Sequence, residues 1–355
     1  MPTVNANATI LVTGSNGFLG TWVVDTLLKR GYSVRAAVRT EARGQHLLKM
    51  FESYGHKLQI FPVGDIAADG AFDEAVKAVE GIIHTAATVG ANLEAMEATT
   101  IIDEAVQGNI GILKSALKNG TSLKRVVITS SCGARTGYSS VPKHVDEHSW
   151  NDAAVAEAER LGKGASSLAK YTASKTLAEK AAWEWYENHK TFFSWDLASF
   201  NPPWIFGPML HEVQDIEDIN ASNKQLYNAV VKGVLYSYGV PGITPLNTPS
   251  HAWIDVRDVA ELHVRGLENP AAADQKTLIM SGKFVWQDAM DAVNSISPTP
   301  WPSHKEPWAK GEVGEKIYNL IWDVEKEKRI FGLKFRTIEE TVKDFFADLE
   351  RRGWS

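Results

Sequence analysis

Two side chains of this sequence have the types and the spacing for proton transfer. Tyr171 and Lys175 stand four residues apart in the run Tyr-Thr-Ala-Ser-Lys, so a helix would place both on one face. An ammonium beside a phenol favours the phenolate and lowers the pKa of the phenol from about 10 towards neutrality, where general acid–base catalysis is most efficient. About forty residues earlier, Thr129-Ser130-Ser131 ends an apolar run. The alternative is that Tyr171 and Lys175 are a helical surface pair.

A second motif has the spacing of a phosphate-binding turn. The apolar run Ile10-Leu11-Val12 passes into Thr13-Gly14-Ser15-Asn16-Gly17-Phe18-Leu19-Gly20 and then into an apolar-periodic segment. This order predicts a buried strand, a glycine turn and a helix whose first N–H groups face a pyrophosphate. The alternative is an ordinary strand-to-helix turn, because 27 glycines in 355 residues will produce chance matches.

The elements around these motifs alternate between strand and helix. An alternation of this kind predicts an α/β fold, a Rossmann-type doubly wound parallel sheet, with a smaller C-terminal substrate-binding domain. We expect residues 1–203 to form the dinucleotide-binding domain, with 251–268 packing back on it, and residues 204–250 and 269–355 to form the smaller one. Further strands are predicted at 32–38, 58–63, 82–84, 126–129 and 197–200, and helices at 41–54, 71–80, 101–118, 165–189 and 337–352. Residues 251–267 are expected to begin as a strand and continue as a helix, and the chain is expected to be helical again after about residue 308.

Composition excludes several classes of protein. The 37 Lys and Arg against 43 Asp and Glu give a net charge of −6, which does not suggest a nucleic-acid or anionic-membrane partner. Cys132 is the single cysteine, so no intramolecular disulfide can form, and the histidines show no ligand spacing, so we expect no metal site. No stretch like a signal peptide and no run of 18 apolar residues is present, and we expect a cytoplasmic protein.

Together these motifs resemble the extended (atypical) short-chain dehydrogenase/reductase family. Within it the chain looks like the branch that holds fungal NADPH-dependent carbonyl and aldehyde reductases and plant dihydroflavonol reductases. The resemblance covers nearly the whole chain. The matching segments are the glycine turn, Asp65, His84-Thr85-Ala86-Ala87, Thr129-Ser130-Ser131, Tyr171 to Lys175, Asn201-Pro202-Pro203, Gly207-Pro208 and Trp253 to Ala260.

The resemblance implies a role for each matching residue. Tyr171 would protonate a carbonyl oxygen as hydride arrives, Lys175 would hold the nicotinamide ribose and tune Tyr171, and Ser131 would orient the same oxygen. Asp65 and Ile66 would contact the adenine, and Pro202 with the chain up to Trp204 would contact the nicotinamide. Further cofactor contacts are implied for Thr13, Gly14, Asn16, Gly17, Phe18, Leu19, Gly20, Thr85, Ala86 and Ala87.

The end of the second strand decides between the two nicotinamide cofactors. An NAD-binding fold places a carboxylate there for the ribose hydroxyls, but this chain has Val38-Arg39-Thr40. Arg39 and Arg43 resemble the basic pair that holds the 2′-phosphate, and the fork of an arginine can bond two phosphate oxygens. We therefore expect NADPH as the cofactor. The alternative is that both arginines are solvated surface charges.

The expected activity is an NADPH-dependent reduction of an uncharged, partly hydrophobic aldehyde or ketone. The segment between Trp204 and Trp253 is rich in aromatic and aliphatic residues, Tyr238 among them, and has no arginine. Cys132, Trp204 and Trp253 are candidates for the pocket wall, although they could equally be core residues. The alternatives are a nucleotide-sugar epimerase or dehydratase and a noncatalytic dinucleotide sensor.

One position departs from the family pattern. In members of the family, the helix before the fifth strand often carries an asparagine at the position of Gly111 in this chain. The role of the nearby Asn109 is therefore left open. The sequence also leaves open the physiological substrate, the stereochemistry, and whether the chain is a monomer or a homodimer.

Overall fold

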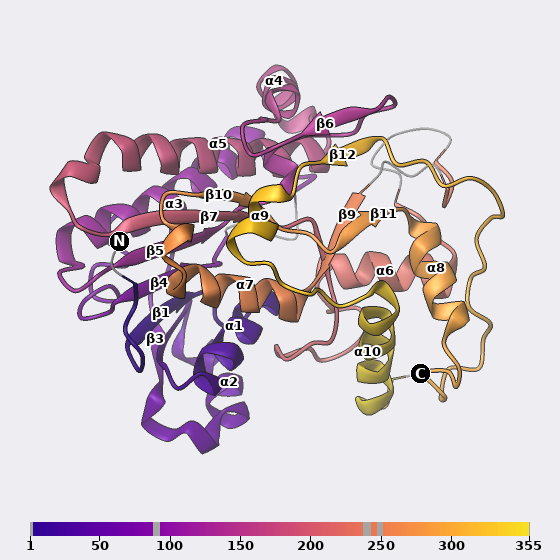
Figure 1. Ribbon diagram of the computed structural model, residues 1–355, viewed down its shortest axis with the longest axis horizontal. Coiled ribbons are helices and arrows are strands. Elements are labelled where there is room, and N and C mark those ends of the chain that lie inside the picture. The colour runs from indigo at the N-terminus through magenta and orange to yellow at the C-terminus, as the bar shows by residue number, and fades with distance from the viewer. Residues whose placement is uncertain (1–2, 88–92, 237–242, 247–250, 355) are drawn as a thin grey trace.

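A seven-stranded parallel sheet forms the centre of the protein, in the order β10-β7-β5-β4-β1-β2-β3 (Figure 1). The computed structural model describes residues 3–87, 93–236, 243–246 and 251–354. Its strand order reverses beside β1, where ligands bind in folds of this kind. The strands are β1 (Thr9–Thr13), β2 (Ser33–Val38), β3 (Leu58–Pro62), β4 (Gly81–His84), β5 (Arg125–Thr129), β7 (Asp196–Asn201) and β10 (Lys276–Leu278).

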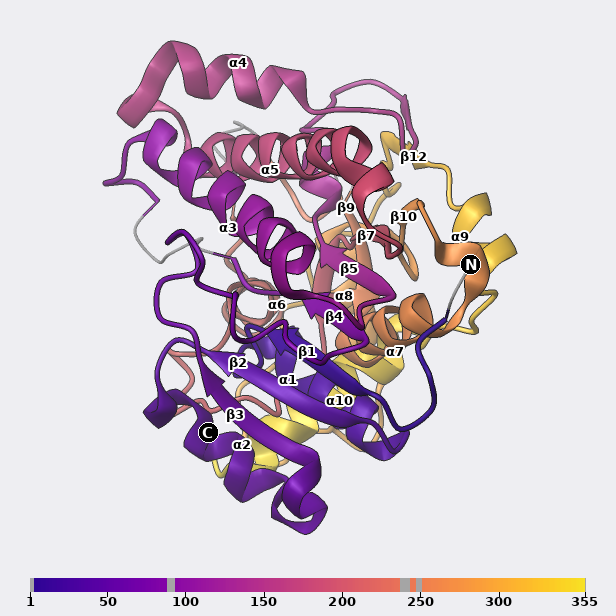
Figure 2. The same ribbon diagram turned by 90° about the vertical axis from the view of Figure 1, so that its left-hand side faces the viewer.

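Helices cover both faces of this sheet (Figure 2). On one face α1 (Phe18–Lys29) and α7 (Val256–Glu268) share an apolar core with the strands. On the other face α3 (Ala98–Asn119) and α5 (Ser167–His189) pack side by side over a second core, and α4 (Asp152–Leu161) lies outside α5. The two layers bury the strands on both sides, which is why these strands are almost continuously apolar.

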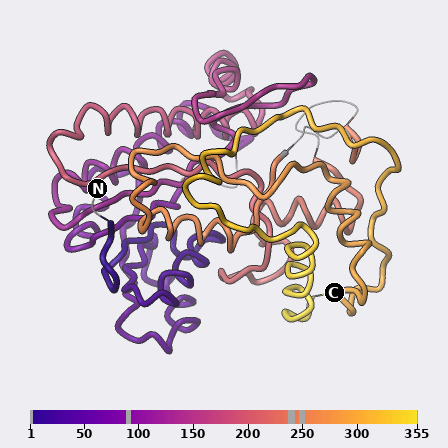
Figure 3. The backbone as a smooth tube through the Cα atoms, in the orientation of Figure 1, coloured from indigo at the N-terminus to yellow at the C-terminus, as the bar shows by residue number. Residues whose placement is uncertain are grey.

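A second group of elements follows the sheet along the long axis of the molecule (Figures 1 and 3). A three-stranded sheet of β11 (Gly282–Phe284), β9 (His251–Asp255) and β8 (Trp204–Phe206) packs with α6 (Ala221–Lys232), α8 (Trp286–Ser295) and α10 (Ile338–Arg351) around an aromatic core. The remaining elements are α2 (Gln45–Met50), α9 (Glu325–Ile330) and the paired strands β6 (Lys143–Val145) and β12 (Leu320–Trp322).

The expected doubly wound sheet is confirmed, but several elements differ from prediction. The helix expected at 71–80 is wrong: the backbone makes successive turns there, with positive φ at Gly70 and Ala78. The side chains of Phe72, Ala75, Val76 and Val79 are nevertheless buried. The helix expected at 41–54 is broken into short pieces, of which only α2 is α-helical.

Three helices were missed, α4, α6 and α8. The buried face of α4 consists of alanines, which pack against Ala98 and Ala173 and give only a weak apolar period. β10 also joins the main sheet, although it lies in the range 269–355 that we assigned to the smaller domain. The other domain boundaries stay a prediction.

Two features are absent from the described residues, a membrane-spanning helix and a cluster of metal-binding side chains. Among them, no helix is long and apolar enough to cross a membrane. No group of three or more His, Cys, Asp or Glu side chains in the same residues is arranged to hold a metal ion.

Candidate active site

The glycine turn between β1 and α1 has the backbone that the sequence predicted. Gly14 has a φ of +65°, and a Cβ there would lie 2.9 Å from the backbone of Ala86. A Cβ on Gly20 would lie 2.1 Å from the Gly14 carbonyl oxygen, so only glycine lets α1 start this close to the turn. Gly17 is the N-cap of α1 and has no side chain that could cap the helix. The first turn of α1 contains no acidic residue. The helix therefore offers its first N–H groups to an anion.

Thr13 joins the turn to the end of β4. Its hydroxyl lies 2.8 Å from His84 Nδ1 and accepts the backbone N–H of Ala86 at 3.2 Å. Thr85 donates its hydroxyl to the Thr13 carbonyl at 2.7 Å. Burial and the charge of Lys175 lower the pKa of His84 to about 3, so the imidazole is neutral at physiological pH. These bonds give His84 a structural role.

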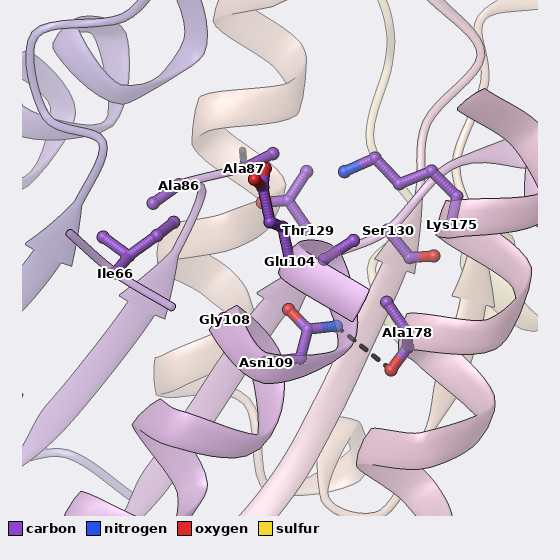
Figure 4. A pocket seen from close by; sticks show the side chains of 11 residues that line it. Ile66, Ala86, Ala87, Glu104, Gly108, Asn109, Thr129, Ser130, Lys175 and Ala178 are labelled. Atoms are coloured by element: carbon purple, nitrogen blue, oxygen red, sulfur yellow. Dashed lines mark hydrogen bonds between the residues drawn. The ribbon is translucent and has the colours of Figure 1, made fainter. Parts of the chain in front are cut away.

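A pocket opens beyond the ends of β4 and β5, between α3 and α5 (Figure 4). Ile66, Ala86, Ala87 and Lys175 line it, and all four were predicted to touch the cofactor. The structure thus brings together residues that are up to 109 positions apart in the sequence. Seven further residues of the wall were not predicted: Glu104, Ala105, Gly108, Asn109, Thr129, Ser130 and Ala178.

The residues of α3 among those seven had a detectable signal. Glu104, Ala105, Gly108 and Asn109 follow the one-face spacing of a helix, so placing that face towards the sheet edge would have found them. Asn109 donates its side-chain N–H to the Ala178 carbonyl at 3.2 Å and so connects α3 to α5.

The three predicted catalytic side chains meet at this edge of the sheet. Ser131, two residues after the end of β5, hydrogen-bonds to Tyr171 in the second turn of α5. Lys175 lies one turn further along α5, with Nζ 6.0 Å from the centre of the Tyr171 ring. The Ser131 oxygen also accepts the backbone N–H of Gly133 at 3.0 Å, which fixes the position of the hydroxyl.

The expected lowering of the Tyr171 pKa is wrong for this structure. Burial raises the pKa of the phenol, and the hydrogen bond with Ser131 only opposes that rise. Burial also lowers the pKa of Lys175 to about 8, against the opposing charge of Glu179. The physical reason is that withdrawal from water disfavours both charged forms, and the ammonium is too far from the phenol to compensate. Tyr171 therefore stays a protonated hydrogen donor at neutral pH.

A buried ionic network lies beneath these residues. Glu179, which is 1% exposed, accepts hydrogen bonds from Ser130 at 2.6 Å, from Ser199 at 2.9 Å and from Asn201 at 2.7 Å. The fully buried Arg135 pairs with the same carboxylate. Because Ser130 follows β5 and both Ser199 and Asn201 belong to β7, the carboxylate joins α5 to these two strands.

The predicted phosphate-binding arginines lie at the end of β2. Arg39 and Arg43 are exposed, and neither guanidinium makes an ion pair or side-chain hydrogen bond with another residue of the described ranges. Asp65 is exposed as well and uses its carboxylate to accept the Ala67 N–H at 3.0 Å. No acidic side chain stands where an NAD-binding fold would place one, since Val38 is followed by Arg39 and Thr40.

Other predicted residues lie around the entrance to α1 and beyond β7. Phe18 packs against both the main core and the aromatic core, with its ring centre 5.5 Å from that of His211. Leu19 is buried, while Asn16 is partly exposed in the turn. The Pro202 carbonyl accepts the Cys132 N–H at 2.9 Å and so aligns the two strand ends.

The three candidates for the substrate pocket lie in packed surroundings. Cys132 is 6% exposed, packs with Ala252, Leu278 and Met280, and donates its thiol to the Asn201 carbonyl at 3.1 Å. Trp204 and Trp253 both belong to the aromatic core, with Trp204 the more accessible. Their pocket roles stay predictions, and Tyr238 lies outside the described residues.

Comparisons with known proteins agree with this geometry. A model of the NAD dependent epimerase/dehydratase family matches residues 10–281. Ketoreductase azaE of Aspergillus niger is 31% identical over 344 residues, which cover 94% of this chain and 95% of that protein. NADPH-dependent methylglyoxal reductase GRE2 of Saccharomyces cerevisiae is 29% identical over 347 residues, with 94% and 96% covered. The solved structure of yeast methylglyoxal/isovaleraldehyde reductase Gre2 complexed with NADPH matches with a TM-score of 0.78 at 27% identity, and covers 97% of this chain and 99% of that chain.

Proposed function

Because the chain belongs to the NAD dependent epimerase/dehydratase family, we propose that it is an NADPH-dependent carbonyl reductase that converts an aldehyde or a ketone to an alcohol. The observation that carries this proposal is the hydrogen bond between Ser131 and Tyr171, one helical turn from a lysine in the wall of the pocket. This arrangement presents two hydroxyl groups to a single acceptor oxygen. Relatives named ketoreductase and methylglyoxal reductase support the same class of reaction.

The residues of the chain divide the proton chemistry between them. When bound, NADPH would supply the hydride. Tyr171, whose pKa is raised by burial, holds its proton until charge develops on the carbonyl oxygen and then donates it. Ser131 donates a hydrogen bond to the same oxygen, and Lys175 binds the ribose beside Tyr171. Glu179 keeps the ends of β5 and β7 aligned with α5 through its four donors.

NADPH fits the residues at the entrance to α1. The uncapped first turn of α1 suits a pyrophosphate, and a side chain at Gly14 or Gly20 would collide with neighbouring backbone. Exposed arginines at 39 and 43 favour a 2′-phosphate over a free hydroxyl. The solved yeast relative that contains NADPH supports this choice.

We propose an uncharged, partly hydrophobic substrate, such as an aromatic ketone or a keto ester. Residues 204–236 follow β7 and contribute to the aromatic core, and the sequence from 204 to 253 contains no arginine that would recognise a carboxylate or a diphosphate. Trp204 remains partly accessible beside this core. An apolar wall with two placed hydroxyls is the usual design of a site for such molecules.

The test is the absorbance of reduced nicotinamide during incubation with a panel of aldehydes and ketones. Consumption of NADPH with carbonyl compounds, and little with NADH, is the expected result. If NADPH binds but no carbonyl in the panel is reduced, the noncatalytic sensor would be favoured. Tightly held NAD that survives gel filtration would favour the epimerase or dehydratase instead.

A further inference from the structure

Lys170, the residue before Tyr171, lies in a cage of backbone carbonyls. It is 0% exposed, and its Nζ donates to the carbonyl oxygens of Leu93 at 2.9 Å, Glu94 at 3.2 Å, Met96 at 2.9 Å and Lys163 at 2.7 Å. An ammonium has three N–H donors, so four acceptors saturate it. A buried lysine satisfied wholly by main-chain oxygens ties separate chain segments together.

The cage joins three elements at one point. Leu93, Glu94 and Met96 lie just before the first turn of α3, and Lys163 lies in the turn between α4 and α5. Glu97, the N-cap of α3, makes no side-chain cap of its own. The start of α3 is therefore held against the start of α5 by Lys170.

A second contact holds the same two helices further along. The side chain of Asn109 on α3 donates to the Ala178 carbonyl on α5 at 3.2 Å (Figure 4). Eight residues separate Lys170 from Ala178, which is about 12 Å along a helix. Glu104 of α3 and Lys175 of α5 lie between the two contacts and face the pocket from opposite walls.

We propose that Lys170 is a positioning residue that sets the separation of α3 and α5 and thereby the fit of the cofactor pocket. This inference rests on the proposed function, because it takes the pocket between these helices to be the NADPH site. The side chain of Lys170 does not line the pocket, and its Nζ is enclosed by the carbonyls. Its removal should therefore weaken cofactor binding more than the chemical step.

The experiment measures NADPH binding to Lys170→Met by quenching of tryptophan fluorescence, without any carbonyl present. We expect Kd to rise about tenfold, as for other changes remote from a ligand. At saturating NADPH we expect kcat to stay within about threefold of wild type, because the change affects binding rather than the reacting groups. Lys180→Met, the same substitution at the surface of the same helix, should leave both values unchanged.

Chemical rescue separates this role from general destabilisation. Ammonium chloride should lower the raised Kd of Lys170→Met, because ammonium can donate to the vacated carbonyls, whereas tetramethylammonium chloride at equal ionic strength has no N–H to offer. If Lys170→Met does not fold, Lys170→Gln keeps two N–H donors and should show a smaller rise in Kd.

Two results would overturn the inference. One is a folded Lys170 variant with the Kd of wild type. The other is a raised Kd that ammonium lowers no more than tetramethylammonium does. A wild-type chain that binds NADPH but reduces no carbonyl would overturn the proposed function alone, because the Kd ratio between variant and wild type would still be measured.

Discussion

The carboxylate of Glu179 accepts the hydroxyl of Ser130 at 2.6 Å and thereby joins the helix that carries Tyr171 to the strand end that carries Ser131. The two residues are 49 positions apart in the sequence, so it is the folding of the chain that brings them together. The fully buried Arg135 balances the charge of the carboxylate. The Ser131–Tyr171 hydrogen bond is therefore built on a buried ionic network.

Replacing Glu179 with alanine should strongly destabilise the fold. The change leaves Arg135 buried without its counterion, and losing one partner of a buried pair costs about 3–5 kcal/mol. Glu187→Ala is the matched control, because Glu187 is on the same helix but pairs with Lys190 at the surface, where a pair is worth about 1 kcal/mol or less. Denaturant unfolding of both variants checks this. Equal losses of unfolding free energy in the two variants would show that the buried network stabilises the fold no more than a surface ion pair does.

Tyr171→Phe should abolish reduction while leaving NADPH binding nearly intact. The change removes the proton donor, and general acid catalysis contributes roughly 10²–10⁴ in rate. Single-turnover kinetics, which isolate the chemical step, and fluorescence titration with NADPH give the two values. More than a tenth of wild-type turnover in this variant would contradict the assignment. Lys175→Ala should impair both activity and NADPH binding.

NADPH binding should weaken as the pH rises through about 8. Burial lowers the pKa of Lys175 to about 8, so its ammonium is intact below that pH and is lost above it. Burial raises the pKa of Tyr171, so the phenol does not titrate in this range. The Kd for NADPH, measured between pH 6 and about 9.5, should therefore rise in Tyr171→Phe as in wild type. In Lys175→Met the rise should be missing, and its persistence would assign the titration to another group.

Arg39→Asp should shift the cofactor preference from NADPH towards NADH. A hydrogen bond to a charged group contributes about 1.5–3 kcal/mol, so the ratio of kcat/KM for NADPH to that for NADH should fall by about 10-fold or more. Lys49→Asp makes the same change of charge on nearby α2 and should leave the ratio near that of wild type. An unchanged ratio in Arg39→Asp would mean that this arginine is only a solvated surface charge.

A keto ester should be a better substrate than the matching keto acid. The carboxylate of the acid would lose water without gaining an arginine fork, because residues 204–253 contain no arginine and their only cations are Lys224, which pairs with Glu217, and Lys232. Steady-state kcat/KM values for an ethyl ester and its free acid test this directly. A value for the acid equal to or above that of the ester would reject the proposed substrate class.

Local patterns were enough to predict the parts of this protein whose structure depends on nearby residues. The glycine turn, the parallel strands and the pairing of Tyr171 with Lys175 on one helix follow from backbone preference and apolar period within short windows. The positive φ of Gly14 and the close packing at Gly20 involve only a few adjacent peptide units, so the spacing of the glycines is enough to predict both.

Only the tertiary structure decided what surrounds those residues. The carboxylate of Glu179 accepts hydrogen bonds from Ser130, Arg135, Ser199 and Asn201. The ammonium of Lys170 donates to carbonyls up to 77 positions away in the sequence. No short window of the sequence contains both partners of these contacts. The raised pKa of Tyr171 likewise depends on burial by distant chain. Sequence spacing fixes which side chains share a face, whereas solvation and long-range contacts depend on how the whole chain closes over them.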